Sequence, residues 1–366
     1  MLALTNDDIE KVLTMEVCLE AMEESFRANA LGESVNTPWC NMYTQQGESE
    51  NSPVHHVLRT SMGCVSNTGI AAIRINSEIF KWVPVASRKR KVKTSDFEGK
   101  PLTGFILLFE NSTGMPVALM PDRYVDKTRV AATNGLGVKY LSRSNSKTIG
   151  LLGTGWQATS QLRAFCYVRP IEKVKVYSPT EANRLSFSQN MQQVLGIPVK
   201  AVSTVEEAVE GVDIIAAATN SVDPVIQPEW LKPGIHISIL KELEVSAQVM
   251  DRCDVISANL RTPLKAPVEF FSMGGWAHTS EGLDDFVPGL EVRQDWWHNQ
   301  SYWKRMASLE DLIIEAKPGR QKDSDITLFL SRGVAHQFSS TGAKILQLAQ
   351  AKGIGNPMPI ENLLRY

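Results

Sequence analysis

The sequence predicts an α/β protein whose centre is a doubly wound parallel sheet. Residues 148–152 are a short β-rich run that ends in a glycine-rich turn, and a helical pattern without proline or glycine follows. From this turn to residue 256, strand-like and helix-like segments alternate, which is typical of parallel sheets with helices on both faces. The length of 366 residues leaves room for a second domain.

The turn reads Gly153-Thr154-Gly155-Trp156-Gln157-Ala158, a G-x-G-x-x-A pattern between a strand and a helix. Gly153 permits a tight turn, Gly155 lets the backbone approach a pyrophosphate, and Ala158 allows close packing of helix on strand. Free N–H groups and the positive end of the helix dipole would then face the phosphates. The turn therefore predicts a dinucleotide site, and the alternative is an ordinary βα turn that contains glycine.

The end of the second strand, residues 174–177, bears on the choice of dinucleotide. An acidic residue there would bind the ribose 2′-hydroxyl and favour NAD. The chain instead reads Tyr177-Ser178-Pro179-Thr180, with Arg184 in the first turn of the next helix. The hydroxyls of Ser178 and Thr180 together with Arg184 could bind a 2′-phosphate. We therefore expect NADP rather than NAD, although Arg184 could also be an ordinary surface residue.

The residues before the turn do not show a regular alternation of strands and helices. A helix is expected over 5–31, with Thr5 or Asn6 as its cap, and an irregular polar segment over 33–68. A β-like run over 70–76 contains Arg74, which is costly inside a sheet unless its charge is paired or binds an anion, or unless it lies at a solvent-facing edge. The basic run 87–93 is expected to be a solvated loop, with phosphate contact or partner docking as alternatives. A hairpin over 102–109 and 116–120 and a helix over 123–143 follow.

After the turn, further elements are expected in a regular order. The strands are 174–177, 199–202, 213–219, 234–239 and 254–256, and the helices are 181–195 and 205–210. Residues 260–318, rich in aromatic side chains, break this rhythm, and we interpret them as a surface excursion or as a lid or subunit contact. A strand over 324–330 and a helix over 334–352 complete the chain.

Composition excludes several classes of function. A net charge of −2 gives no general attraction to nucleic acid or to an anionic membrane, and no apolar run approaches the ~20 residues of a membrane span. The N-terminus is too acidic for a signal peptide. The five cysteines are scattered without a C-x-x-C pair, so we expect reduced thiols in the cytoplasm. No metal site is expected, because no group of His, Cys and carboxylates has suitable spacing.

Several motifs together resemble the ornithine cyclodeaminase/mu-crystallin family over nearly the whole chain. They are Asp7-Asp8-Ile9 with 20–23, 104–108 with 113–116, 128–132, the turn at 153–157, Ala218-Thr219, and 318–329 with Ser331-Arg332-Gly333. Their order and spacing carry the resemblance. It implies a homodimer in which each subunit has a Rossmann domain, residues 126–330 with the 260–318 insertion, and a substrate-binding and dimerisation domain, residues 1–125 and 331–366. It also implies hydride transfer between nicotinamide and the α-carbon of an amino or imino acid.

The resemblance also implies roles by position. Thr103 and Arg129 match residues that line the nicotinamide and the substrate, and Ser331 matches a substrate-pocket position. The pyrophosphate contacts are matched by Trp156 and Gln157, beside Gly153, Thr154 and Gly155. Ser178 matches the adenosine-ribose position, and Thr219, followed by Asn220, matches a contact near the nicotinamide ribose.

Three departures from the family pattern affect the expected chemistry. Trp39 stands where the family has an early substrate-binding Arg, and Arg74 stands where it has a Lys. Arg74, like Arg129, could hold a carboxylate, but a guanidinium cannot act as a proton donor or base. The loop 240–244 lacks the Asp of the cyclodeaminases. Lys241 or Glu242 could supply proton transfer instead, or the two could be a solvated pair at a loop tip.

These features lead to an expected function and two alternatives. The first is an NAD(P)-dependent imine reductase or amino-acid dehydrogenase in which Arg74, Lys241 and Glu242 form the catalytic set. The alternatives are an ornithine cyclodeaminase-type ammonia lyase with recycled NAD and a non-enzymatic, crystallin-like NADP-binding protein. The expected partners are a small amino or imino acid and a second copy of the chain.

Overall fold

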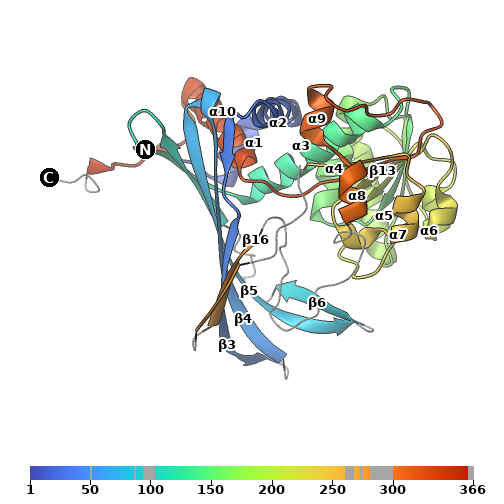
Figure 1. Ribbon diagram of the computed structural model, residues 1–366, viewed down its shortest axis with the longest axis horizontal. Helices are drawn as coiled ribbons and strands as arrows, with labels where there is room; N and C mark the ends of the chain where they lie inside the picture. Colours follow the sequence, from blue (N-terminus) through green and yellow to red (C-terminus); the bar gives the residue numbers. More distant parts are fainter. Residues whose placement is uncertain are drawn as a thin grey trace. The chain divides into compact units, whose positions relative to one another are not determined.

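The chain is an α/β protein that forms two compact units in a computed structural model (Figure 1). The structure describes residues 1–49, 52–85, 88–93, 104–259, 268–272, 275–280 and 300–361. Unit 1 comprises Met1–Asp126, Leu264–Glu291 and Gly333–Tyr366, and unit 2 comprises Lys127–Pro263 and Val292–Arg332. No helix in the described ranges is long and apolar enough to cross a membrane.

Unit 2 is built on a parallel sheet, which confirms the predicted fold class. The strand order is β11-β10-β9-β12-β13-β18-β14-β17, and every pair in it is parallel. The strands are β9 (Thr148–Leu152), β10 (Lys173–Tyr177), β11 (Val199–Ala201), β12 (Ile214–Ala217), β13 (His236–Ile239), β14 (Val255–Ala258), β17 (Ala307–Ser308) and β18 (Thr327–Leu330). The central strands are buried along their whole length, as expected for a sheet covered on both faces.

Helices connect these strands. They are α3 (Arg123–Leu141), which enters unit 2 from unit 1, α4 (Trp156–Val168), α5 (Glu181–Leu195), α6 (Val205–Val209), α7 (Ala247–Asp251), α8 (Gln300–Arg305) and α9 (Leu309–Ile313), with 3₁₀ turns η2 (Pro228–Trp230) and η3 (Glu242–Glu244). Helices α3 to α6 lie where the sequence predicts them, whereas α7, α8 and α9 were not predicted. Gly196 ends α5 in the left-handed conformation, which a glycine adopts without steric cost.

Unit 1 is built on a mixed sheet that includes both ends of the chain. Its order is β15-β16-β3-β4-β5-β7-β8-β1-β19, with β2 on β4 and β6 on β5. The strands are β1 (Leu2–Ala3), β2 (Ser34–Asn36), β3 (Trp39–Ser49), β4 (Ser52–Val65), β5 (Ile70–Val85), β6 (Arg88–Lys93), β7 (Gly104–Glu110), β8 (Pro116–Pro121), β15 (Val268–Ser272), β16 (Gly275–Ser280) and β19 (Asn356–Pro357). Helices α1 (Asn6–Val12), α2 (Met15–Ala30) and α10 (His336–Lys352) lie beside it (Figure 1).

The single helix predicted over 5–31 is wrong, because the chain breaks between α1 and α2. Leu13 leaves the helical conformation, and the hydroxyl of Thr14 accepts a hydrogen bond from Val17 N at 3.2 Å as the cap of α2. Thr5 caps α1 in a capping box with Asp8, as predicted. The apolar period continues through the break, so periodicity alone does not reveal it.

The irregular segment predicted over 33–68 is also wrong, because this region holds the long strands β3 and β4. Their inner face carries buried polar side chains, among them Asn41 and Ser61, so apolar and polar residues do not alternate in the usual way. Arg59 donates from Nε to Asn41 Oδ1 at 2.5 Å on this face. This cross-strand hydrogen bond satisfies the Asn41 oxygen inside the sheet.

The basic run is a strand, β6, rather than the predicted solvated loop. It pairs antiparallel with the second half of β5, and two of its lysines contact the buried carboxylate of Glu78. Lys91 Nζ lies 3.0 Å and Lys93 Nζ 2.6 Å from the Glu78 oxygens. Burial alone would raise the pKa of Glu78, but the charges of the two lysines outweigh it and hold this pKa well below its usual range.

The 260–318 segment contributes to both units. β15 and β16 extend the sheet of unit 1 through β3, and α8 and α9 belong to unit 2. Tyr302 and Trp303 of α8 are buried, and the Tyr302 hydroxyl donates to Asp251 Oδ1 at 2.7 Å. Trp296 and Trp297 lie outside the described residues, so the roles of lid or subunit contact stay predictions.

Candidate functional site

The glycine turn after β9 lies where the order of the parallel strands reverses. β9 is flanked by β10 and β12, and the crevice at such a switch point is where α/β sheets bind ligands. Gly153 has φ +104°, and a Cβ at this position would lie 2.4 Å from Ala218 O in the loop after β12. Only glycine fits both the backbone conformation and this close approach.

The N-terminus of α4 is open to an anion. Gly155 is its N-cap, and no side chain caps the helix. A Cβ at Gly155 would meet no other atom within 4 Å, while Ala158 is fully buried against the sheet. Within the described part of the chain, the buried Gln157 Oε1 has no hydrogen-bond partner. Exposed N–H groups at a helix N-terminus suit phosphate oxygens, so these residues fit a dinucleotide pyrophosphate.

Trp156 and Lys127 form one side of this turn. The Trp156 side chain is 41% exposed, and Lys127 Nζ of α3 lies 5.7 Å from the centre of its ring, within range of a cation–π contact. Lys127 was not predicted from the sequence. Lys127 is far from the glycine turn along the chain, so the sequence does not indicate that it lies near Trp156. The packing of α3 beside α4 brings the two residues together.

The loop after β10 places the residues expected near the adenosine ribose. Ser178 is buried, and Thr180 is the exposed N-cap of α5. Arg184 Nη1 donates to Ser178 O at 3.2 Å, and Arg184 Nη2 lies 3.6 Å from Glu181 Oε1. Arg184 thus stabilises the loop and has a carboxylate beside it.

Glu244, which was not predicted from the sequence, connects the loops after β12 and β13. Its carboxylate is fully buried and accepts hydrogen bonds from Thr219 N at 2.8 Å, Thr219 Oγ1 at 2.9 Å, Leu240 N at 2.8 Å and Lys241 N at 3.1 Å. Burial raises the pKa of Glu244, although these hydrogen bonds favour its ionised form. Thr219, expected near the nicotinamide ribose, is therefore held in place by Glu244, and exposed Asn220 follows it.

The candidates for proton transfer lie in the loop after β13. Glu242 Oε2 lies 3.0 Å from Arg332 Nη1, and Arg332 N donates to Asn259 Oδ1 at 2.5 Å. Ser331 N donates to Ile239 O at 3.2 Å, so the buried Ser331 lies beside the start of this loop. Lys241 and Glu242 are not a solvated pair, because Arg332 is the cation that pairs with Glu242.

Arg129 lies on α3 in unit 2 and is 4% exposed. One turn further along, Asn134 Nδ2 donates to Gln161 Oε1 of α4 at 2.9 Å. This contact ties the helix that carries Arg129 to the helix that begins at the glycine turn.

Arg74 lies in unit 1, on the buried face of β5, and its charge is paired. Its Nε and Nη2 each lie 2.8 Å from Asp122 Oδ2, and Nη2 lies 3.6 Å from Asp126 Oδ1. The guanidinium also lies 5.4 Å from the Trp39 ring centre and 5.1 Å from that of Phe338. Burial disfavours the charge, but attraction to Asp126 and Asp122 outweighs it and raises the pKa of Arg74. The alternative of a solvent-facing edge arginine is wrong.

The glycine turn, the loops after β10 and β12, and the loop carrying Lys241 and Glu242 therefore lie at the carboxyl ends of the unit 2 strands, whereas Arg129 lies on α3. Arg74 belongs to unit 1, and Thr103 lies outside the described residues. No group of three or more His, Cys, Asp or Glu within the described ranges could hold a metal ion.

Known proteins are similar to this chain in sequence and in fold. The model of the family described as "Ornithine cyclodeaminase/mu-crystallin family" matches residues 1–352. A Delta(1)-pyrroline-2-carboxylate reductase of Bacillus thuringiensis subsp. konkukian is 32% identical over 260 residues, 70% of this chain and 74% of that protein. The structure of Thermococcus litoralis Delta(1)-pyrroline-2-carboxylate reductase with NADH and L-proline has a TM-score of 0.75 at 24% identity, covering 98% of this chain and 100% of that one. An archaeal alanine dehydrogenase dimer with bound NAD has a TM-score of 0.73 at 24% identity, covering 98% and 99%.

Proposed function

The chain belongs to the ornithine cyclodeaminase/mu-crystallin family, and we propose that its substrate is an imino or amino acid that is reduced or oxidised at the α-carbon. The enzyme is an NAD(P)-dependent oxidoreductase of the reductase and dehydrogenase type. The observation that supports the proposal most strongly is the open N-terminus of α4 at the switch point of the sheet. Fixed phosphates there would place a nicotinamide near the loops that follow β12 and β13.

The chain's own residues would bind and orient the reactants. A bound nicotinamide would supply or accept the hydride. We assign the substrate carboxylate to Arg74 or Arg129, and we assign proton transfer at the substrate nitrogen to Lys241 or Glu242. Because its paired guanidinium stays cationic, Arg74 acts as an anchor rather than as an acid or base. Arg332 orients the Glu242 carboxylate at 3.0 Å.

We propose NAD(H) as the cofactor, although the sequence led us to expect NADP. Arg184 already donates to Ser178 O, and the neighbouring Glu181 carboxylate would repel a 2′-phosphate. The two solved structures described above hold NADH and NAD. Titration with both reduced cofactors tests this choice, and tighter binding of NADPH would restore the original expectation.

A turnover assay tests the proposed reaction. Purified protein should oxidise NADH when Δ1-pyrroline-2-carboxylate, or pyruvate with ammonium, is added, and the loss of reduced-nicotinamide absorbance reports it. Ammonia released from ornithine with a catalytic amount of NAD would instead identify a cyclodeaminase. Tight NADH binding without turnover on any imino acid would identify a non-enzymatic binder.

Replacing Arg74 tests whether it binds the substrate carboxylate. Arg74→Met should raise the KM for a carboxylated substrate roughly 10- to 100-fold, which corresponds to about 1.4–2.8 kcal/mol of lost binding free energy. It should leave the KM for NADH unchanged. Because Arg74→Met leaves Asp122 buried without its cation, Arg74→Lys is the matched control and should recover part of the substrate affinity. An unchanged substrate KM in Arg74→Met would assign the carboxylate to Arg129.

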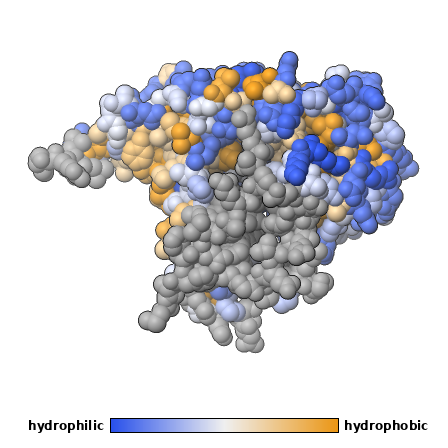
Figure 2. All heavy atoms as spheres, in the orientation of Figure 1, coloured by the Kyte–Doolittle hydropathy of each residue, from blue (hydrophilic) through white to orange (hydrophobic). Residues whose placement is uncertain are grey.

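We also propose that the enzyme is a homodimer. One face of the unit 1 sheet exposes Met42, Met62 and Phe105 at 44%, 51% and 43%. The register places Met62 beside Ile73 and Leu107, and Phe105 beside Ile75, so these side chains share a face. Figure 2 shows hydrophobic side chains gathered over this sheet. Such exposed apolar patches mark protein interfaces.

A further inference from the structure

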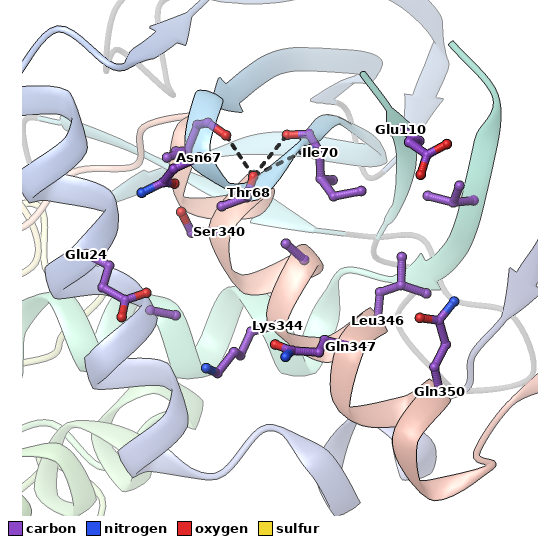
Figure 3. Close-up of a pocket in the computed structure, with 14 residues that line it drawn as sticks. Glu24, Asn67, Thr68, Ile70, Glu110, Ser340, Lys344, Leu346, Gln347 and Gln350 are labelled. Carbon is purple, nitrogen blue, oxygen red and sulfur yellow. Dashed lines mark hydrogen bonds between the residues drawn. The ribbon is translucent and has the colours of Figure 1, made fainter. Parts of the chain in front are cut away.

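Unit 1 contains a pocket of about 480 Å³ between α2, α10 and the edge of its sheet, next to η1 (Ser66–Thr68) (Figure 3). Its volume falls within the roughly 300–1,000 Å³ of small-molecule sites. The apolar part of its lining includes Ile70, Val117 and Leu346. None of the residues expected in the cofactor or substrate site lines it.

Ser340 of α10 is the buried polar group of this pocket. It is 6% exposed, and its Oγ has no hydrogen-bond partner in the part of the chain that the structure describes. A buried hydroxyl without a partner carries a desolvation penalty. A polar ligand atom in the pocket would remove this penalty.

Three charged side chains line the same pocket. Figure 3 shows Glu24 and Glu110 at opposite sides, with Lys344 nearer to Glu24. Neither the Glu24 nor the Lys344 side chain forms an ion pair or hydrogen bond with another described residue, whereas Glu110 Oε2 accepts from Thr113 Oγ1 at 2.8 Å. The lining therefore offers two carboxylates and one ammonium group.

We propose that this pocket binds an α-amino acid with a cationic side chain. Such a molecule carries two ammonium groups and one carboxylate, which complement the charges of the lining. Its α-ammonium pairs with Glu24, and its carboxylate pairs with Lys344 and accepts from Ser340 Oγ. Its methylene chain lies along Ile70, Val117 and Leu346, so the side-chain ammonium reaches Glu110.

Calorimetric titration of the full chain without cofactor tests the ligand class. L-Lysine should bind, and two analogues should bind about five- to tenfold more weakly, because each loses one charge contact. Cadaverine lacks the carboxylate, and L-norleucine lacks the side-chain ammonium. No binding of L-lysine, or equal binding of either analogue, overturns the proposal.

Substitutions locate the binding. Glu24→Gln, Glu110→Gln and Lys344→Met should each weaken L-lysine binding about fivefold, while circular dichroism verifies the fold. Glu20→Gln on α2 and Lys352→Met on α10 remove the same charges outside the pocket and should bind like the unmodified chain. L-Lysine binding that is lost in Arg74→Met but retained in the pocket variants would place the ligand in the substrate site and overturn the proposal. Because this titration needs no turnover, failure of the proposed oxidoreductase activity would leave its result unaffected.

Discussion

At the scale of single residues, the site depends on contacts that sequence spacing does not reveal. Gly153 and Gly155 are recognisable because their roles are local, in a turn between a strand and a helix. Glu244 and Lys127 are not, because their partners Thr219 and Trp156 lie on other elements. The sequence indicated the phosphate site, whereas the residues that hold its neighbouring loops required the folded arrangement.

Replacing Glu244 should weaken the binding of NADH. In Glu244→Gln, an NH₂ group replaces one oxygen and faces N–H donors, so two of the four hydrogen bonds to this side chain are lost. Loss of hydrogen bonds to a buried charged group costs about 1.5–3 kcal/mol, so the KM for NADH should rise roughly 10- to 100-fold. Steady-state kinetics measures the KM for NADH. Glu229→Gln, an exposed glutamate of unit 2, is the control, and equal KM values in both variants would contradict the role of Glu244.

At the scale of elements, the two sheets differed in how far the sequence predicted them. The strands β12, β13 and β18 are short, fully buried segments, and short runs rich in apolar residues and bounded by turns are recognisable without tertiary information. The strands β3, β4 and β6 are not, because buried polar and charged side chains, such as Arg59 and Lys91, interrupt their apolar pattern. The cations that suggested a loop pack against Glu78 and Phe80 instead.

The ion pairs between β6 and Glu78 should make the stability of β6 depend on pH. The folded-state pKa of Glu78 is depressed, so its stabilisation is present above the unfolded pKa of about 4.3 and is lost as pH falls through the folded-state pKa. Glu78→Gln should therefore lower the protection of the β6 amides by about 1–3 kcal/mol at neutral pH. The difference in amide protection between Glu78→Gln and the unmodified chain should become smaller in acid, where Glu78 is protonated. Hydrogen exchange measures the protection of the β6 amides. Glu10→Gln on α1 replaces an exposed glutamate and is the control. A difference in protection between Glu78→Gln and the unmodified chain that grows in acid would contradict the ion pair.

At the scale of the whole molecule, the proposed dimer rests on the exposed face of the unit 1 sheet. Phe105 and Met62 lie on the face opposite to Ile106 and Leu108, which are fully buried, and a Cβ at Gly342 of α10 would meet Leu108. One face of this sheet is thus covered by α10, while the other keeps its apolar side chains exposed. The proposed two-fold symmetric dimer would cover such an exposed apolar patch.

Charge placed on that face should separate the subunits. Phe105→Glu and Met62→Glu, alone or together, would bury a carboxylate without a partner in an apolar interface, which costs several kcal/mol and shifts the dimer towards monomer. Light scattering during size-exclusion chromatography measures the mass, and NADH titration verifies that unit 2 still folds. Leu185→Glu, an exposed leucine of α5 in unit 2, is the matched control and should leave the mass unchanged. A dimer that persists in the Phe105 and Met62 variants would move the interface to another surface, and a monomeric unmodified chain would exclude the dimer itself.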